Sequence, residues 1–421
     1  MTALLTSLRS GDCPDFDSLV DQLAPALPML LDLAATPQDP EWHGEGDVHT
    51  HTAWVLREVY EQWASSGTLD ADDRATLVLA AALHDIAKPL TTKQAERDGR
   101  IRIIAPRHAD RGRSYLASRR WLAGGRTSVK SADACAGDGA GVWARVLALV
   151  GHHHDPRQLV VRDAQPAAYA RLARACDTRL LYMLAVADMS GRACADKRER
   201  LDELELFRMM CQDHGCFGRD PYDDWRATFD ADAPGWSPDH LRRALAQGIR
   251  DHEAGLIHAP HEAIARGYAL EDARARLVVV CGPSGSGKST WIAEHLPAAA
   301  VVSLDALRAT ISGDPADQSR NGQVRQEAMR LLRQHLAAGR TVAYDATNLR
   351  RDFRRDVVAL GWDYRAFVEM VAFATDEPTC QARNQGRSRQ VPRRVIERQF
   401  DTWQTPYLHE ADTLRYRLGG P

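Results

Sequence analysis

The spacing of apolar residues divides the chain into a helical N-terminal half and a C-terminal half in which strands and helices alternate. In the first half, apolar residues recur with a helical period, which predicts helices over 52–63, 73–87 and 180–188. In the second half, short runs rich in branched apolar residues predict buried strands at 277–280, 300–303, 341–345 and about 367–373. A long helix is predicted over 323–338, and this alternation is typical of a doubly wound parallel sheet. We therefore expect a multidomain protein, with an all-α domain followed by an α/β domain.

Length and composition agree with more than one domain. The 421 residues are too many for one hydrophobic core, and 44% apolar and 26% charged residues are ordinary for a soluble globular protein. We expect the all-α domain at 1–195, a helical connector at 196–274 and the α/β domain at 275–421. The formal net charge of −3 excludes a protein-wide field that attracts nucleic acid or anionic lipid, so such contacts require local patches.

A glycine-rich turn follows the first predicted strand of the C-terminal half. It satisfies the pattern G-x-x-x-x-G-K-[ST] between a strand and a helix, where backbone N–H groups and the helix N-terminus can surround phosphate groups. Lys288 can reach the β- and γ-phosphates, and the hydroxyl of Ser289 can bind Mg²⁺. The sequence therefore predicts a site for ATP, or another nucleoside triphosphate, with Mg²⁺, formed by Gly282, Ser284, Gly285, Ser286, Gly287, Lys288, Ser289 and Thr290.

Further charged residues in this half suit phosphoryl transfer. Asp305 follows the strand at 300–303, at the edge of a parallel sheet where ligands bind, and can accept the proton of an attacking hydroxyl. Arg308 can orient the acceptor or neutralise its phosphate. Arginines between 380 and 399 predict a lid over the migrating phosphate, with Arg383 and Arg387 as its working residues, and a solvated helix face is the alternative.

Histidines and aspartates recur on successive predicted helices of the N-terminal half. His84 and Asp85 lie at the end of an apolar helix, where a buried carboxylate requires a partner. His108, the triplet 152–154 and Asp188 follow at wide intervals. Each histidine alone is more often a surface or satisfied core residue. Together, imidazoles and carboxylates on facing helices are how helical bundles hold metal ions.

This H…HD…H…H…D series, over residues 40–195, resembles the HD superfamily of metal-dependent phosphohydrolases. The resemblance implies an all-helical domain with one or two divalent metals that activate water for attack on a phosphoester. Histidine-rich donors suit Mn, Fe, Co, Ni or Zn better than Mg. The resemblance makes Lys88 a candidate phosphate contact, with a solvated helix end as the alternative. His152 remains an alternative to His153 as the metal ligand. The implied ligands are His51, His84, Asp85, His108, His153 and Asp188.

The C-terminal half, from about 275 to 420, resembles the 5′-hydroxyl polynucleotide kinases of the P-loop phosphotransferases. The shared features are the phosphate loop, segments 303–308 and 344–348, and segment 380–384 followed by Arg387 and 391–392. The resemblance implies that Asp305 is the general base, that Arg308 contacts the acceptor end and that Arg387 holds ATP phosphates.

Together, the two halves resemble the bacterial HD-domain polynucleotide kinases, which heal broken RNA ends. That resemblance implies phosphorylation of a 5′-OH by one half and hydrolysis of a 2′,3′-cyclic phosphate, or a related 3′-side phosphate, by the other. The partners would be RNA or DNA ends, with a functional link to an RNA ligase. Two alternatives are a small-metabolite or nucleotide kinase fused to a nucleotide-hydrolysing HD domain, and a kinase regulated by a nucleotide-binding HD half without catalysis.

The cysteines and the apolar runs bear on localisation. The eight cysteines are scattered without a C-x-x-C pair, which favours reduced thiols over a disulfide framework. No run of about 18 apolar residues occurs, and no basic start precedes a long apolar stretch. We therefore expect a cytoplasmic protein without membrane contact.

Overall fold

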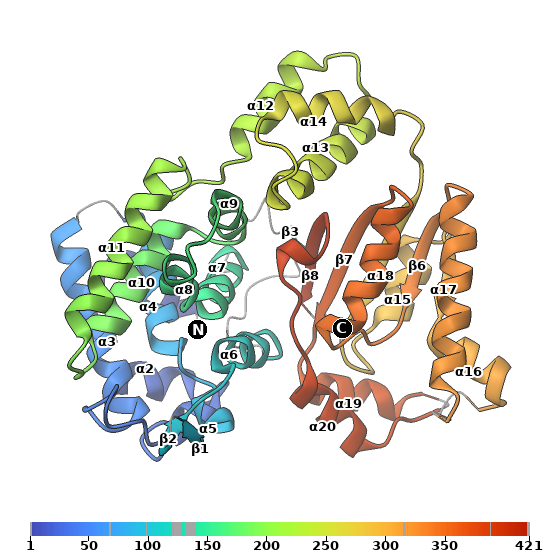
Figure 1. The fold of residues 1–421 in the computed structure, drawn as a ribbon. Helices are drawn as coiled ribbons and strands as arrows, with labels where there is room; N and C mark the ends of the chain where they lie inside the picture. Colours follow the sequence, from blue (N-terminus) through green and yellow to red (C-terminus); the bar gives the residue numbers. More distant parts are fainter. Residues whose placement is uncertain are drawn as a thin grey trace. The chain divides into compact units, whose positions relative to one another are not determined.

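The computed structural model separates into two units (Figure 1). The first comprises Met1–Gly125 and Ala134–Pro221, and the second comprises Arg126–Asp133 and Tyr222–Pro421. The structure describes residues 2–66, 69–97, 99–119, 121, 128–130, 140–314, 317, 319–387 and 389–418. The predicted order of a helical region followed by an α/β domain is confirmed. The expected connector at 196–274 is divided between the two units instead of forming a third.

Helices with extensive apolar faces build the first unit. Its elements are α1 (Thr2–Ser10), α2 (Phe16–Leu23), η1 (Pro28–Asp32), α3 (Val48–Ser66), α4 (Ala71–Leu83), α5 (Lys88–Thr91), β1 (Lys93–Arg97), β2 (Arg100–Ile104), α6 (His108–Ala117), α7 (Ala140–His152), α8 (Asp155–Val161), α9 (Pro166–Ala175), α10 (Thr178–Ser190) and α11 (Lys197–Asp213). Every residue of α4 from Ala75 to Leu83 is buried, and this helix packs against α1, α3, α7 and α10. A helix that is apolar on all sides belongs at the centre of a bundle.

The ends of α4 differ from the sequence prediction. The helix begins after Asp70, whose carboxylate accepts the N–H of Asp73, so the cap lies before the start expected at 73. Asp73 is buried instead and pairs with Arg145 and Arg179. The helix ends at Leu83, four residues earlier than predicted, and His84 is its C-cap. This early end places the His84–Asp85 pair on a turn before α5.

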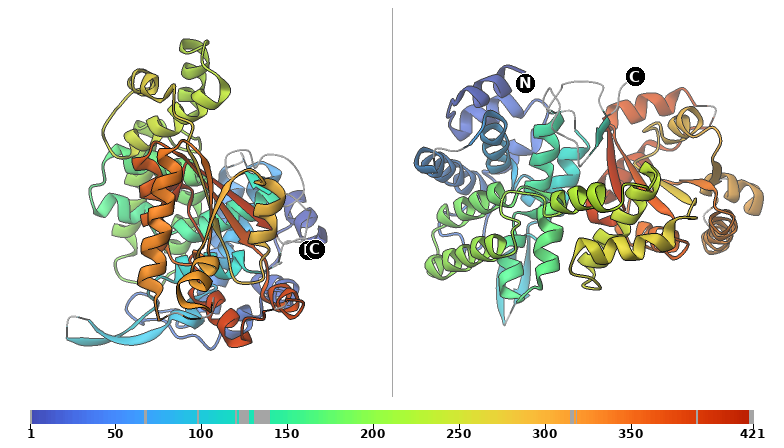
Figure 2. Two further views of the ribbon diagram at one scale, coloured as in Figure 1. Left: turned by 90° about the vertical axis from the view of Figure 1, so that its right-hand side faces the viewer. Right: turned by 90° about the horizontal axis from the view of Figure 1, so that it is seen from above.

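A two-stranded antiparallel ribbon interrupts the helices of the first unit. β1 and β2 join α5 to α6, and the pairing runs from Lys93 opposite Ile104 to Arg97 opposite Arg100. In both views of Figure 2 the ribbon projects away from the helices. The helical pattern of the sequence did not predict this element, so the HD region is not entirely helical.

A mixed sheet forms the centre of the second unit. The elements are β3 (Ser128–Lys130), α12 (Asp223–Asp232), α13 (Pro238–Glu253), α14 (Pro260–Gly267), η2 (Tyr268–Leu270), β4 (Arg276–Cys281), α15 (Lys288–His295), β5 (Ala300–Ser303), α16 (Leu304–Ser312), α17 (Asn321–Ala337), β6 (Thr341–Asp345), α18 (Arg351–Asp363), β7 (Phe367–Ala374), α19 (Glu377–Gln385), α20 (Arg393–Thr402), η3 (Leu408–Glu410) and β8 (Thr413–Leu418). The strand order is β3-β8-β7-β4-β6-β5. The five strands from β8 to β5 are parallel, and β3 is antiparallel to β8.

Helices cover both faces of this sheet, which explains its almost wholly apolar strands. Val278 and Val280 of β4 share a cluster with Trp291 and Ile292 of α15. The intervening Leu277 lies on the other face, where the backbone of α18 approaches it at Gly361. All eight residues of β7 are buried, as expected for a strand covered on both faces. The four predicted strands are confirmed, whereas β3 and β8 were missed.

The helices within the expected connector pack on the unit to which each belongs. α11 contacts α8 and α10 of the first unit. In the second unit, α13 is joined to the sheet by Arg243, which donates to the carbonyl of Ala275 at 2.6 Å, and by the ion pair of Arg250 with Asp412. The stretch is therefore structured throughout its described residues.

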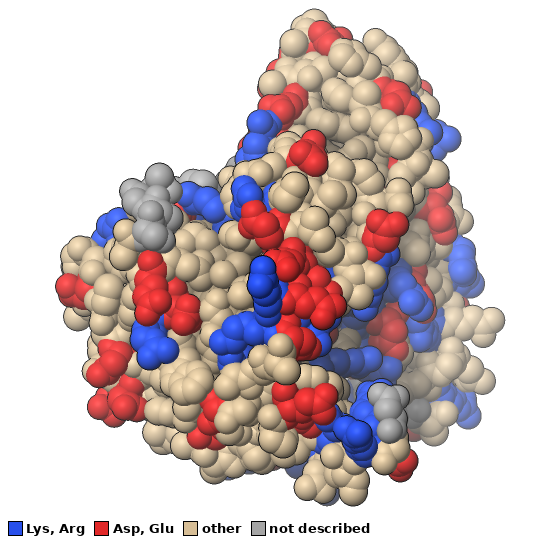
Figure 3. Space-filling view, turned by 60° about the vertical axis from the view of Figure 1, so that its left-hand side comes forward, with Lys and Arg blue, Asp and Glu red and all other residues tan. Residues whose placement is uncertain are grey.

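The charged surface is mixed. On the face drawn in Figure 3, Lys and Arg side chains lie interspersed with Asp and Glu side chains, in agreement with the net charge of −3. In the part of the chain that the structure describes, no helix combines the length and apolar character needed to cross a membrane.

Candidate active sites

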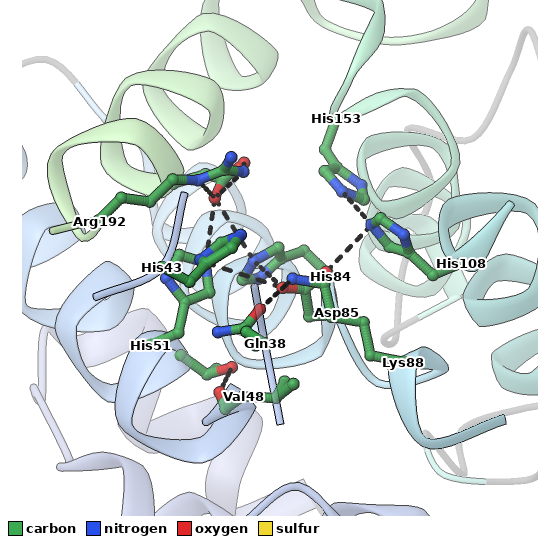
Figure 4. Close-up of polar contacts among 12 residues, drawn as sticks. Gln38, His43, Val48, His51, His84, Asp85, Lys88, His108, His153 and Arg192 are labelled. Carbon is green, nitrogen blue, oxygen red and sulfur yellow. Dashed lines mark hydrogen bonds and ion pairs between the residues drawn. The ribbon is translucent and has the colours of Figure 1, made fainter. Parts of the chain in front are cut away.

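His84 and Asp85 lie at the C-terminal end of the buried helix α4. The Nδ1 of His84 donates to the carbonyl of Ala81 at 2.8 Å, which assigns the ring proton to Nδ1 and leaves Nε2 with a lone pair. That Nε2 lies 3.2 Å from Oδ2 of Asp85 (Figure 4). Both side chains are almost completely buried, so the turn presents an imidazole and a carboxylate to the protein interior.

Two further histidines are oriented in the same way. His108 donates from Nδ1 to the carbonyl of Ala105 at 2.7 Å, and His153 donates from Nδ1 to the carbonyl of Val150 at 2.8 Å. Their Nε2 atoms lie 3.3 Å apart, and Nε2 of His108 is 3.1 Å from Oδ1 of Asp85. The Nε2 atoms of His84 and His108 therefore face the carboxylate of Asp85, and Nε2 of His153 lies next to that of His108. Backbone acceptors of this kind fix ring orientation in metal sites.

His51 and Asp188 complete the group on its opposite side. Nε2 of His51 lies 3.1 Å from Oδ1 of Asp188 and 3.7 Å from Oδ2 of Asp85. Its Nδ1 faces Oε1 of Glu45 at 2.9 Å. Asp188 also receives a bidentate ion pair from Arg192, with its closest contact at 2.7 Å. The structure thus brings together all six residues of the H…HD…H…H…D series.

The histidine triplet divides between two environments. His154 joins the cluster, because its Nε2 is 2.9 Å from Nε2 of His108. His152 instead contacts Oδ2 of Asp155 through Nδ1 at 2.6 Å. This geometry favours His153 over His152 as a ligand, and it adds His154, which sequence reasoning missed although the triplet was visible.

Glu45 was also missed. Its buried carboxylate receives Nδ1 of His43 at 2.8 Å, Nδ1 of His51 at 2.9 Å and the amide of Ala193 at 2.9 Å. Burial alone raises the pKa of Glu45, but the hydrogen bonds from His43 and His51 outweigh it and hold that pKa well below the ordinary value. The only sequence signal was a lone acid in the loop before α3, so its role as an orienting carboxylate depended on the fold.

The donor set fits divalent metal ions. Nε2 of His84 and both carboxylate oxygens of Asp85 are buried and make no hydrogen bond of good geometry among the described residues. Such orphaned donors and acceptors are costly unless a ligand satisfies them. Three groups have ligand atoms within 4.8 Å of one another, namely His51–His84–Asp85, His108–His153–His154 and His43–Glu45–His51. The residues of the first two groups would hold divalent metal ions, whereas the third group consists largely of atoms that already contact one another as donor and acceptor.

The pKa shifts of His153 and Asp85 agree with this fit. Burial, reinforced by the charges of His108 and His84, lowers the pKa of His153 to about 3. Burial raises the pKa of Asp85, but the nearby Lys88 and His84 lower it more, so the net pKa is well below the ordinary value. Neutral imidazole and ionised carboxylate are the forms that bind metals.

Lys88 lies beside the cluster and not in solvent. Its Nζ is 2.7 Å from Oδ2 of Asp85 and donates to Oε1 of Gln38. A solvated helix end is therefore excluded for this side chain. Gln38, from the loop before α3, is a further residue that the sequence did not indicate.

A cavity of about 280 Å³ opens on the cluster. Its lining brings His153 and Asp188 together with cationic and aromatic side chains from the loop before α3, from α8 and α11, and from the residues just before α8 and just after α10. Those side chains are Trp42, His43, His154, Arg157, Arg192 and Arg200. The cavity therefore combines the metal-type cluster with groups that bind an anionic ligand.

The phosphate loop of the second unit has the backbone that its sequence predicts. Gly285 and Gly287 have φ angles of +85° and +96°, in the left-handed region that favours glycine. A Cβ at Gly285 would lie 2.4 Å from the carbonyl oxygen of Cys380. Lys288 turns into the loop and donates to the carbonyls of Gly282 at 2.9 Å and Pro283 at 2.7 Å. The loop is thus already curved around its own lysine.

Residues from neighbouring strands meet this loop. Ser289 donates from Oγ to Oδ2 of Asp345, at the end of β6, at 2.8 Å. A serine beside a carboxylate at this position is the pair that holds Mg²⁺ in P-loop enzymes. Asp345 is the last residue of the strand predicted at 341–345 and falls within the shared segment 344–348, but the sequence indicated no role for it. Thr290, the last predicted loop residue, is exposed.

Asp305 and Arg308 lie on the first turns of α16. Ser303, two residues earlier, pairs with Asp345 across β5 and β6, so α16 begins beside the Ser289–Asp345 contact. The two side chains form an ion pair, in which Asp305 is 74% exposed and Arg308 is 18% exposed.

The arginines after β7 lie near the phosphate loop. Arg383 donates to the carbonyl of Ser286 at 3.4 Å. Arg387 is exposed, and its charge adds to burial in lowering the pKa of Lys288. Gln399 of α20, which the sequence did not indicate, accepts the amide N–H of Ser284 at 2.7 Å. The segment from α19 to α20 therefore contacts the loop directly.

Comparison with known families agrees with both sites. Residues 48–189 match the HD domain, and residues 277–407 match the AAA domain. The comparison with curated proteins returned no match. The first match spans His51 to Asp188, and the second spans the phosphate loop, Asp305, Arg308 and the arginine segment. The chain therefore joins an HD domain of the phosphohydrolase type to a P-loop kinase-like domain.

Proposed function

We propose that the protein heals broken nucleic-acid ends with two activities. The P-loop domain phosphorylates 5′-OH ends with ATP, and the HD domain hydrolyses 2′,3′-cyclic phosphate or a related 3′-side phosphate. Cleavage of RNA through its 2′-OH leaves these two ends, and a ligase generally requires both to be changed. The proposal therefore gives one chemical reason for two phosphate-handling sites in one chain.

The observation that carries the kinase assignment is the openness of the Asp305–Arg308 pair. None of the residues of α16 is buried, and the Asp305 carboxylate is 74% exposed beside the phosphate loop. A kinase for a small metabolite encloses its acceptor to exclude water, whereas the end of a polymer requires an open approach. The openness therefore favours a polynucleotide acceptor.

The kinase residues then have defined roles. Asp305 accepts the proton of the 5′-OH as its oxygen bonds to the γ-phosphorus, and the bond to the β,γ-bridging oxygen breaks to release ADP. Arg308 leaves its ion pair with Asp305 to bind the phosphate nearest the acceptor. Lys288, Arg383 and Arg387 neutralise the transferred phosphoryl group. Ser289 and Asp345 would hold Mg²⁺ on the ATP phosphates.

The HD residues supply the second activity. His51, His84, Asp85 and Asp188 would hold one metal ion, and Asp85, His108, His153 and His154 would hold another. A bound divalent metal supplies a water of lowered pKa and stabilises charge on the phosphate. Lys88 donates a proton or a hydrogen bond to a phosphate oxygen, while Gln38 positions its ammonium group. Arg157 and Arg200 bind the anionic ligand in the cavity.

The test is an assay of both ends of defined strands. Purified protein is incubated with ³²P-labelled ATP and a 5′-OH oligonucleotide, and separately with an RNA that ends in a 2′,3′-cyclic phosphate. We expect transfer of label to the oligonucleotide and loss of the cyclic phosphate. Labelled nucleosides with unlabelled oligonucleotides would support a nucleotide or metabolite kinase instead. Metal analysis of the same preparation identifies the ions in the HD domain.

A further inference from the structure

The charges on the β1–β2 ribbon are segregated by face. Cross-strand partners share a face and successive residues alternate, so the register assigns each side chain to one side. Lys93, Arg97, Arg100 and Arg102 fall on one face, which we call the cationic face. Gln94, Glu96, Ile101 and Ile103 fall on the other. Every basic strand residue is thus on the same side, and the acidic one is opposite.

The basic residues of the cationic face do not stabilise the ribbon. Arg97 and Arg100 are direct cross-strand partners, and like charges in that position destabilise a ribbon. Lys93, Arg97 and Arg100 are exposed, and their side chains form no ion pair or hydrogen bond with any residue that the structure describes. Several other arginines of this unit pair with a carboxylate, for example Arg9 with Asp72 and Arg145 with Asp73. Three cations held together without partners favour an anionic ligand.

Arg102 connects this face to the HD cavity. It pairs with Asp39 at 2.9 Å, and its guanidinium group lies 4.2 Å above the ring of Trp42. Trp42 lines the cavity together with His153 and Asp188. The ribbon is also fixed at both ends, because it follows α5 with Lys88 and precedes Ala105, the acceptor for His108. The cationic face therefore leads from the ribbon tip to the cavity mouth.

The spacing of the charges suits a regular polyanion. Alternate residues on one face of a strand are about 6.7 Å apart. The four cations therefore occupy three successive levels along the ribbon, with Lys93 at one end, Arg102 in the middle, and Arg97 beside Arg100 at the other end. A phosphodiester backbone presents single negative charges in a row, and its terminal phosphate is the group that the cavity would bind. An acidic protein segment has no such reason to end at a phosphate-binding cavity.

We propose that the cationic face of the β1–β2 ribbon binds the phosphate backbone of a single-stranded polynucleotide whose 3′ end occupies the HD cavity. This inference rests on the proposed hydrolysis of 3′-side phosphates and assigns that activity to polymers. Arg97 and Arg100, at the same level of the ribbon, and Lys93, at its other end, contact phosphates upstream of the 3′ end. The face supplies affinity, whereas the cluster supplies the chemistry.

The experiment compares the triple variant Lys93→Gln/Arg97→Gln/Arg100→Gln with the double variant Gln94→Ala/Ile101→Gln on the opposite face. KM and kcat are measured for a 20-nucleotide RNA with a terminal 2′,3′-cyclic phosphate and for a 2′,3′-cyclic mononucleotide. We expect KM for the RNA to rise at least tenfold in the triple variant, with a less than twofold change for the mononucleotide. The dependence of log KM on log salt should weaken by about 2, because three phosphate contacts are lost. The double variant should behave as the wild type.

Three results would overturn the inference. The first is a wild-type KM for the RNA in the triple variant, and the second is an equal rise in both variants. The third is retained RNA binding with lost binding of poly-aspartate, which would assign the face to an acidic protein. Thermal melting of each variant confirms that it is folded.

Failure of the proposed activity gives a different result. If the wild type hydrolyses neither substrate, the HD assignment fails, and the ribbon is tested by binding alone. Fluorescence anisotropy with a 5′-labelled single strand then measures affinity directly. Tenfold tighter binding by the wild type than by the triple variant supports the cationic face, and equal binding overturns it.

Discussion

The HD cluster and the phosphate-loop site of the kinase-like domain are built in opposite ways. In the HD cluster, His51, His84 and Asp85 are almost fully buried, and backbone carbonyls or Glu45 fix the imidazoles. In the kinase-like domain, Asp305 is exposed, and Lys288 is bonded to its own loop. A site for an ion of fixed geometry gains from rigid, desolvated ligands, whereas a site for a nucleotide and, as we propose, a polymer end requires room to open. The comparison indicates that the HD centre is preformed, whereas the phosphate-loop site is completed when its ligands bind.

The largest effect is expected for a variant that lacks the preformed HD centre. The double variant His84→Ala/Asp85→Ala should reduce cyclic-phosphate hydrolysis about 1,000-fold, because about 4 kcal/mol of transition-state stabilisation is lost. Metal content should fall in parallel. Kinase activity should change less than twofold, since the second unit has its own core. Parallel assays of both ends with metal analysis measure this. Hydrolysis that survives the change would show that the cluster is not catalytic.

The next effect tests the open site. Asp305→Asn should lower kcat of the kinase by about 100-fold to 10,000-fold, the usual contribution of a general base. Binding of ATP should be retained, because the phosphate loop is unchanged. Initial rates measure the change in kcat, and equilibrium binding of an ATP analogue measures the affinity for ATP. Glu327→Gln, an exposed change on α17 that removes an ion pair with Arg330, is the matched control.

A smaller effect is expected for a variant that changes how the histidines of the buried cluster are oriented. Glu45→Gln keeps the shape of the side chain but removes the charge that faces His51 and His43. Metal affinity should fall 10-fold to 100-fold, as for other outer ligands of metal sites. Competition with a chelator measures it. Glu61→Gln on α3, the helix that carries His51, changes an exposed acid and should have no effect. Equal affinities for the two variants would mean that Glu45 does not orient the ligands.

The smallest effect concerns the backbone of the phosphate loop. Gly285→Ala combines a φ of +85° with a collision against the carbonyl of Cys380, whereas Gly313→Ala has a φ of +77° and open space. The first change should destabilise the second unit by about 1–3 kcal/mol more than the second, since only it overpacks the loop. Differential scanning calorimetry compares the two melting temperatures. The same shift in both variants would indicate backbone strain alone.

The sequence predicted the parts of this molecule that follow from local chemistry. The strand–loop–helix at 277–290, the aspartates that follow strands and the HD series were visible because short patterns encode them. Glu45, Gln38 and Gln399 were not visible, because each acts on a residue brought near only by tertiary folding. The start of α4 was misplaced since several acids competed for the cap, and Asp73 was taken into a buried ion-pair network.

The strands of the sheet could also be predicted only in part. Four strands carried runs of branched apolar residues, whereas β8 alternates buried and half-buried positions and includes two arginines. The β1–β2 ribbon contains many charged residues, so its pairing is not evident from hydrophobic spacing. Its register, once known, is what separates the basic from the acidic side chains.

The contact between Gln399 and the amide of Ser284 has a mechanical consequence. The carboxamide oxygen of a distant helix occupies an N–H at the rim of the loop where phosphate oxygens arrive, so nucleotide entry and the position of α20 are coupled. A phosphate oxygen can accept this N–H only after the carboxamide of Gln399 has left it, so either that side chain or the whole of α20 has to move when the loop binds phosphate.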